Sequence, residues 1–281
     1  MKTFRNILIT GLAFLLVSST VRAQGDIISA ADFMKLFKAD KSLVIIDASK
    51  AADYKKSHIK NAINIPNGDL NQDAETGFLK SDEELGKLFG SKGVNNESTI
   101  IVYDGGSQKP ASRVYWVLKY LGAPNVKILH KNMATFKKAR VPLTPMAAKK
   151  SATTFTVNVN HAIAANLADV KAGTAKLFDA RDANEYAGTT EKSKGHIPGA
   201  INLSYKDVLN ADNAFKTKDE LEKVVAGFGL NADTPIIVSC QSGKRAAVLY
   251  VAFTSVLGYK NVKMYDGSYN DWVAKGNTVE K

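Results

Sequence analysis

The strongest constraint on the fold of this chain is an internal repeat. Each half contains, in the same order, an apolar run that ends in aspartate, an acidic-aromatic step, a His-Ile step, a second apolar run and a Leu-Gly step. The blocks are residues 43–49, 53–54, 58–64, 99–104 and 120–127 in the first half and residues 175–181, 185–186, 196–202, 235–240 and 256–263 in the second. Five matches at a nearly constant offset indicate a duplication. The repeating unit has the size of an ordinary domain.

Apolar runs alternate with helical segments in both halves. Short continuous apolar runs, such as residues 43–46 and 236–238, are typical of strands buried on both faces of a sheet. Helices are predicted at residues 30–38, 82–89, 111–121, 218–228 and 246–257. Strands that alternate with helices predict an α/β fold, in which each domain has a parallel sheet with helices on both faces.

The boundary between the halves is predicted from a segment without a regular period. Residues 141–145 contain two prolines and show neither a helical nor a strand pattern. We therefore place the linker there and predict one domain at residues 24–148 and a second at residues 149–281.

The first 23 residues have the layout of a secretory signal peptide. Lys2 and Arg5 precede an apolar run at residues 7–17, and Ala23 ends a sequence that approximates a cleavage site. A retained membrane anchor is less favoured, because the run is short for a bilayer span. No cysteine follows the cleavage region, so a lipid anchor has no attachment point. We expect a periplasmic or secreted protein with no membrane attachment after cleavage.

The charge of the chain favours small anions over nucleic acid. The formal net charge is +11, and the predicted leader carries three of the positive charges, which leaves +8. The lysines are scattered, and no nucleic-acid recognition motif is present. A diffuse positive field attracts small anions or an acidic partner and also favours solubility.

Cys240 is the only cysteine of the chain, so it forms no internal disulfide. It follows the apolar run 236–238 and precedes the predicted helix at 246–257, an arrangement that places a nucleophile at the carboxyl edge of a parallel sheet. Loop amides and the helix dipole favour an anion there, Gly243 leaves room, and Lys244 and Arg245 add positive charge. These features favour the thiolate over the thiol and predict a reactive cysteine rather than an inert buried one.

The second half resembles a rhodanese domain. Its loop matches the Cys-x-x-Gly-x-Arg pattern of that family through Cys240, Gln241, Ser242, Gly243, Lys244 and Arg245. Residues 179–181, 195–200 and 267–272 resemble further family signatures. With the first half, the resemblance covers nearly the whole chain after the leader and is to the tandem-domain sulfurtransferases.

The resemblance implies a two-step sulfur transfer. A donor such as thiosulfate gives its outer sulfur to Cys240 as a persulfide, and an acceptor such as cyanide or a thiol removes it. Cys240 is then the catalytic residue. The substrate-binding residues are Gln241, Ser242, Gly243, Lys244, Arg245 and, at the end of a neighbouring strand, Arg181. No cofactor is implied, and no grouping of residues has the spacing of a metal site.

The first half departs from the pattern at the nucleophile. Asp104 stands where the cysteine should be, and Ser49 replaces the arginine. A carboxylate cannot carry sulfane sulfur, so this domain is expected to be inactive and to wall the cleft of the second. His58 and His196 occupy the same place in both halves, which indicates a structural hydrogen bond and not a catalytic base.

Three other functions share part of this pattern. A cysteine phosphatase is disfavoured, because only four residues separate Cys240 from Arg245 and the loop looks too tight for phosphate. A 3-mercaptopyruvate sulfurtransferase shares the two-domain layout, although the Lys244-Arg245 pair favours a doubly charged inorganic donor. The sequence is also compatible with a persulfide carrier or sulfur-binding module that holds sulfur on Cys240 without catalytic turnover.

Overall fold

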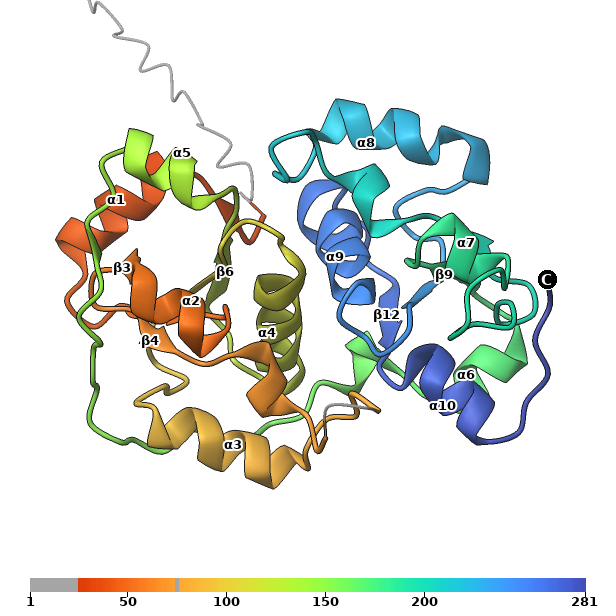
Figure 1. Ribbon diagram of the computed structural model, residues 1–281, viewed down its shortest axis with the longest axis horizontal. Coiled ribbons are helices and arrows are strands. Elements are labelled where there is room, and N and C mark those ends of the chain that lie inside the picture. Colours follow the sequence, from red (N-terminus) through yellow and green to blue (C-terminus); the bar gives the residue numbers. More distant parts are fainter. Residues whose placement is uncertain (1–24, 74–75) are drawn as a thin grey trace, which may run out of the picture.

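The computed structural model describes residues 25–73 and 76–281, and the predicted signal peptide lies outside the described residues. The chain forms two α/β domains side by side, the first drawn in red to yellow-green and the second in green to blue (Figure 1). Among the described residues no helix is long and apolar enough to cross a membrane.

The first domain is built on a five-stranded parallel sheet in the order β1-β6-β5-β2-β4. Its strands are β1 (Ile27–Ile28), β2 (Val44–Asp47), β4 (Ile63–Asn64), β5 (Ile100–Tyr103) and β6 (Val126–Leu129). Its helices are α1 (Ala30–Ala39), α2 (Ala51–Lys56), α3 (Asp82–Ser91), α4 (Lys109–Tyr120) and α5 (Met133–Lys138), with a 3₁₀ turn, η1, at Asn67–Leu70.

The second domain repeats this topology with the order β10-β9-β11-β12-β8. Its parallel strands are β8 (Ala164–Ala165), β9 (Lys176–Asp179), β10 (Ile201–Asn202), β11 (Ile236–Ser239) and β12 (Val262–Tyr265). Its helices are α6 (Leu167–Ala172), α7 (Ala183–Tyr186), α8 (Lys218–Val225), α9 (Ala246–Val251) and α10 (Ser268–Ala274), with 3₁₀ turns η2 (His161–Ile163), η3 (Tyr205–Val208) and η4 (Ala226–Phe228). Equivalent strands occupy equivalent places, so the predicted α/β fold and duplication are confirmed.

The continuous apolar runs are explained by burial on both faces of each sheet. In β2, Ile46 belongs to a core cluster on one face and Ile45 to a separate cluster on the other. In β11, Val238 belongs to the first of these clusters and Ile237 to a third cluster on the opposite face of the sheet. Successive side chains of a strand point to opposite faces, so helices on both sides require apolar residues at every position.

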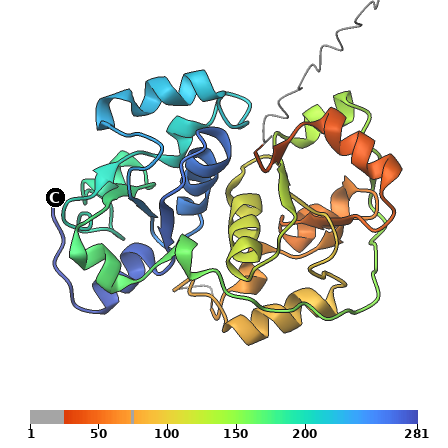
Figure 2. The same ribbon diagram turned by 180° about the vertical axis from the view of Figure 1, so that it is seen from behind.

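The two domains meet along the helices that follow their central strands. α4 and α9 lie side by side between the sheets in both views (Figures 1 and 2). Their inner side chains join one hydrophobic cluster that includes Val114 and Leu118 from α4 and Val248 from α9. The loop before each of these helices therefore begins close to the other domain.

The connection between the domains differs from the predicted linker. Within residues 141–145, the strand β7 (Leu143–Thr144) pairs antiparallel with β3 (His58–Ile59), so this segment belongs to the first domain. Residues 148–160 contain no helix or strand and run along the first domain, where Phe155 packs on Phe89 with ring centroids 5.7 Å apart. The division at residues 148 and 149 stays a prediction.

Two predicted helices end earlier than expected as α-helices. The helix predicted at 218–228 is α-helical to Val225 and then tightens into η4. The helix predicted at 246–257 is α-helical to Val251 and continues as a π-helical stretch at Ala252–Val256. Both segments remain helical, so the topology is unaffected.

Candidate active site

Cys240 lies directly after β11, at the carboxyl edge of the sheet, and is 1% exposed. Its backbone N–H donates to the Ser268 hydroxyl at 3.1 Å, and its carbonyl accepts from the Tyr269 N–H at 3.0 Å. The Ser268 hydroxyl in turn donates to the carbonyl of Tyr265 at 2.7 Å. The Asn270 N–H also donates to the carbonyl of the next loop residue, Gln241, at 3.1 Å. The start of α10 thus fixes the backbone on which the thiol is carried.

The amides after Cys240 are available to an anion. In the described part of the chain, the backbone N–H groups of residues 241–246 donate to no protein acceptor. Gly243, in the middle of this loop, has φ +78°, a conformation that only glycine adopts without strain. Buried or half-buried amides without an acceptor favour a negatively charged group at the loop.

A cavity of about 260 Å³ opens at the thiol. It is lined by Lys109, Asp182, Tyr205, Cys240, Gln241, Ser242, Lys244 and Arg245. Five of the seven site residues predicted from the sequence therefore meet at one cavity, and Gly243 lies in the loop between them. The prediction that they act in catalysis or binding stays a prediction.

Positive charge dominates the cavity wall. Burial, followed by the positive charge of Arg113, lowers the pKa of Lys244. Arg245 forms a two-pronged ion pair with Glu185, whose second contact is 2.8 Å, and hydrogen bonding to Arg245 lowers the pKa of Glu185. Lys109 reaches in from the first domain, with Nζ 3.4 Å from the Tyr205 hydroxyl.

Arg113 of the first domain buttresses the same loop from behind. It is 1% exposed and forms an ion pair with Asp266. An ideal Cβ placed on Gly243 would come within 2.5 Å of Arg113 Nη1 and 2.9 Å of Asp266 Oδ1. A side chain at this position would therefore have to displace the Arg113–Asp266 pair as well as adopt an unfavourable backbone angle.

The structure places Arg181, predicted to bind the donor, away from the Cys240 cavity. This side chain is 0% exposed and does not line the Cys240 cavity. Its guanidinium donates to both carboxylate oxygens of Asp179, to the Ser193 hydroxyl at 2.9 Å and to the Gly195 carbonyl at 2.9 Å. It also lies 4.2 Å from the ring centroid of Tyr269. Because these contacts occupy the guanidinium, Arg181 ties loops together and does not face a substrate.

The corresponding loop of the first domain is filled by its own side chain. The carboxylate of Asp104 accepts hydrogen bonds from the amides of Gly106 at 2.6 Å, Gln108 at 3.2 Å and Ala111 at 3.2 Å. Burial raises the pKa of Asp104, although these amides act in the opposite direction. The amides that would bind an external anion are thus already hydrogen-bonded to the Asp104 carboxylate.

The two equivalent histidines have the structural role predicted for them. His58 Nδ1 lies 2.7 Å from the Tyr54 carbonyl, and His196 Nδ1 lies 3.0 Å from the Tyr186 carbonyl. Each ring also stacks on that tyrosine, with centroids 3.6 and 3.7 Å apart. Neither histidine lines the Cys240 cavity.

Sequence reasoning missed Lys109, Tyr205 and Asp182 in the cavity and Arg113 behind it. Two of these, Lys109 and Arg113, belong to the first domain and reach the cysteine only because α4 packs against α9. The available signal was the position of Lys109 in the loop that is equivalent to the cysteine loop. No group of three or more potential metal ligands occurs among residues 25–73 and 76–281.

Comparison with known proteins identifies the two domains. The family described as "Rhodanese-like domain" matches residues 29–139 and 163–275. The chain belongs to the rhodanese family. A Haloferax volcanii protein provisionally named thiosulfate sulfurtransferase is 30% identical over 90% of this chain and 94% of its own length. The 3-mercaptopyruvate sulfurtransferase of Escherichia coli is also 30% identical, over 88% of this chain and 95% of its own length.

A solved structure agrees with this assignment. The rhodanese-fold protein SseA from Escherichia coli has a TM-score of 0.77 at 30% identity and covers 87% of this chain and 99% of its own. The tandem arrangement of two rhodanese domains is therefore shared, and the relatives support a rhodanese-type sulfurtransferase function.

Proposed function

We propose that this protein is a thiosulfate sulfurtransferase that carries sulfur as a persulfide on Cys240. One observation carries the proposal: the thiol lies at a cationic cavity whose loop amides have no acceptor in the described part of the chain. Such a loop stabilises the anionic terminal sulfur of a persulfide much as an oxyanion hole stabilises oxygen.

The reaction proceeds in two balanced displacements. The Cys240 thiolate attacks the outer sulfur of thiosulfate, a sulfur–sulfur bond forms, and the sulfur–sulfur bond of thiosulfate breaks to release sulfite. The persulfide anion then rests against the loop amides. An acceptor such as cyanide then attacks the terminal sulfur. The persulfide bond breaks, thiocyanate leaves, and the Cys240 thiolate is regenerated. A thiol acceptor would take the same sulfur as its own persulfide.

The charges of the cavity favour thiosulfate over 3-mercaptopyruvate. Lys109 and Lys244 line the cavity, Arg245 in its wall is paired with Glu185, and the single acidic residue in the wall, Asp182, is paired with Lys206 at 2.9 Å, so the two lysines leave the cavity positive. A dianion gains about twice as much as a monoanion from each positive charge at the same distance. The E. coli relative supports 3-mercaptopyruvate as the second candidate donor.

Steady-state kinetics with both donors test the proposal. Wild-type protein should turn over thiosulfate and cyanide with a higher kcat/KM than 3-mercaptopyruvate and cyanide, and Cys240→Ser should be inactive with both. A higher kcat/KM for 3-mercaptopyruvate would contradict the choice of donor. A stable persulfide without turnover would indicate the carrier instead.

We also propose that the protein works outside the cytoplasm, as a periplasmic or secreted enzyme. The leader-like residues 1–23 support this proposal. Expression of the full chain in a bacterial host should deliver it to the periplasmic fraction with a new N-terminus near Gln24. Retention in the cytoplasm with Met1 intact would contradict it.

A further inference from the structure

A second cavity, of about 540 Å³, lies between the two domains. It shares no lining residue with the Cys240 cavity. The first domain contributes Asp82 at the start of α3 and Trp116 and Tyr120 of α4, and the second contributes His161 and Asp266. Its volume is in the range of small-ligand sites, which occur preferentially between domains.

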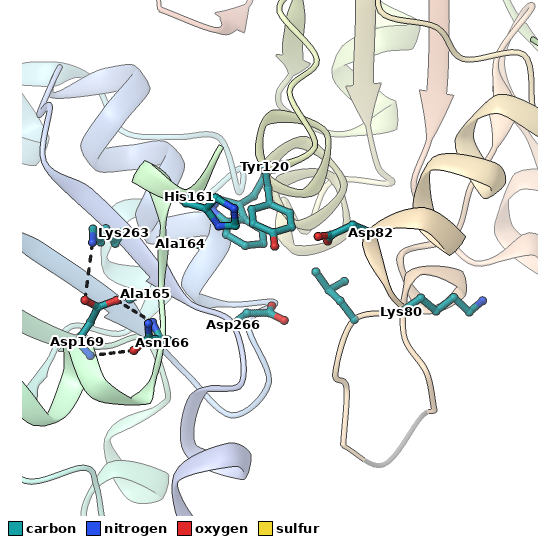
Figure 3. A pocket seen from close by; sticks show the side chains of 12 residues that line it. Lys80, Asp82, Tyr120, His161, Ala164, Ala165, Asn166, Asp169, Lys263 and Asp266 are labelled. Carbon is teal, nitrogen blue, oxygen red and sulfur yellow. Dashed lines mark hydrogen bonds and ion pairs between the residues drawn. The ribbon is translucent and has the colours of Figure 1, made fainter. Parts of the chain in front are cut away.

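One wall of this cavity is aromatic. The rings of Trp116 and Tyr120 stack with centroids 5.2 Å apart and planes 8° apart. Figure 3 shows the Tyr120 ring beside His161, with its hydroxyl on the side of Asp82. Trp116 is 1% exposed, and its indole Nε1 has no acceptor among the described residues, so the wall also contains an unsatisfied donor. Aromatic faces attract cations through their quadrupole, and because the Arg113 guanidinium already lies 5.8 Å from the Trp116 ring centroid, the Tyr120 ring is the one left for a ligand.

Negative charge enters the cavity from both domains. Asp82 lies beside the Tyr120 hydroxyl and Asp266 below it in Figure 3, and both line the cavity. In the described part of the chain Asp82 has no ion-pair partner, whereas Asp266 is held by Arg113. Burial, and then the charge of Asp82, raises the pKa of Tyr120 to about 12. The tyrosine therefore remains a neutral aromatic ring in a negative environment.

The lysines near the cavity do not neutralise its centre. Lys80 extends away from the open space in Figure 3, and its Nζ donates to the Asp69 carbonyl at 2.7 Å. Lys263 lies at the far end, 3.9 Å from Asp169. The centre of the cavity thus presents the carboxylate of Asp82 and an aromatic face, since the charge of Asp266 is balanced by Arg113 and the lysine charges are directed elsewhere.

We propose that this cavity binds a small organic ammonium ion beside Asp82, with its charge against the Tyr120 ring. The aromatic wall favours a bulky alkylated ammonium over a hydrated metal ion, because a ring face replaces water poorly around a small hard cation. The proposal does not depend on the sulfur chemistry of Cys240.

Calorimetric titration of the full-length protein with choline tests this inference, with 3,3-dimethylbutan-1-ol as the neutral control of the same shape. Choline should bind saturably at one site per chain and at least about tenfold more tightly than the neutral alcohol, because the charge is the main attraction. Asp82→Asn should weaken choline binding by about tenfold or more. The matched variant Lys80→Gln should bind as the wild type does, and so should Cys240→Ser, because its cavity is separate.

Three results would overturn the inference: no saturable binding of choline, equal binding of the neutral alcohol, or unchanged binding by folded Asp82→Asn. Circular dichroism and urea unfolding establish that each variant is folded. If Asp82→Asn does not fold, Tyr120→Leu takes its place, because removing the ring should also weaken choline and unchanged binding would contradict the site. Sulfur transfer is not part of the readout, so failure here is distinct from failure of the proposed function.

Discussion

Replacement of Gly243 by alanine measures how closely the first domain supports the cysteine loop. Gly243 and Gly258 have nearly the same backbone angle, with φ of +78° and +76°. A Cβ on Gly258 would meet nothing within 4 Å, whereas a Cβ on Gly243 would lie 2.5 Å from Nη1 of the buried Arg113. Gly258→Ala is therefore a matched control for the cost of the backbone angle alone.

The expected magnitudes follow from these contacts. Each alanine should lower the free energy of unfolding by about 1–2 kcal/mol, because a left-handed backbone is unfavourable for a residue with a Cβ. Gly243→Ala should lose a further ~1–3 kcal/mol, because overpacking forces Arg113 from its place beside Asp266. Urea unfolding of both variants gives this difference. Cyanide-dependent turnover should fall in Gly243→Ala and persist in Gly258→Ala. Equal losses of stability, with turnover unchanged in both, would refute the claim that the first domain buttresses the loop.

Three further predictions concern individual charges. Lys109→Gln should lower kcat/KM for thiosulfate about three- to tenfold, mainly through KM, as one charge of the cavity is lost; steady-state kinetics beside the control Lys87→Gln, an exposed lysine of α3 that does not line the cavity, check this. Arg181→Met should lower the free energy of unfolding by about 3–5 kcal/mol, because it leaves a buried aspartate unpaired, and an unchanged urea midpoint would contradict its structural role. Hydrogen bonding to Arg245 lowers the pKa of Glu185, so the stability it contributes is present above the ordinary carboxyl pKa and is lost as pH falls through the lowered value. The difference in unfolding free energy between wild type and Glu185→Gln should therefore shrink on acidification, and a difference that grows would contradict the assignment.

The sequence predicts the fold well because its signals are local and occur twice. The apolar runs around Ile46 and Val238 are continuous because both faces of each sheet are covered, and this alone indicates buried parallel strands. The position of Cys240 between such a strand and a helix is equally local. The change from α-helix to π-helix after Val251 leaves no comparable mark in the sequence, since Val251, Ala252 and Phe253 are all apolar and buried.

The parts of the site that sequence reasoning missed depend on contacts distant in the chain. Lys109 and Arg113 reach the cysteine loop through the packing of α4 on α9, which neither half encodes by itself. The predicted position of the Arg181 side chain differs from the structure because of local contacts. Arg181 follows a strand at the correct edge, but its guanidinium turns back to Asp179, two residues earlier, and to Ser193. Only the fold shows that these partners occupy it fully.

The central claim is that Cys240 accepts sulfur from thiosulfate, and intact-protein mass spectrometry tests it most directly. The mature protein, freed of excess thiosulfate after incubation, should gain the mass of about one sulfur atom and lose it again on addition of cyanide. Cys240→Ser, treated in the same way, should gain nothing. A wild-type protein that stays unmodified, or a Cys240→Ser variant that gains the same mass, would contradict the account.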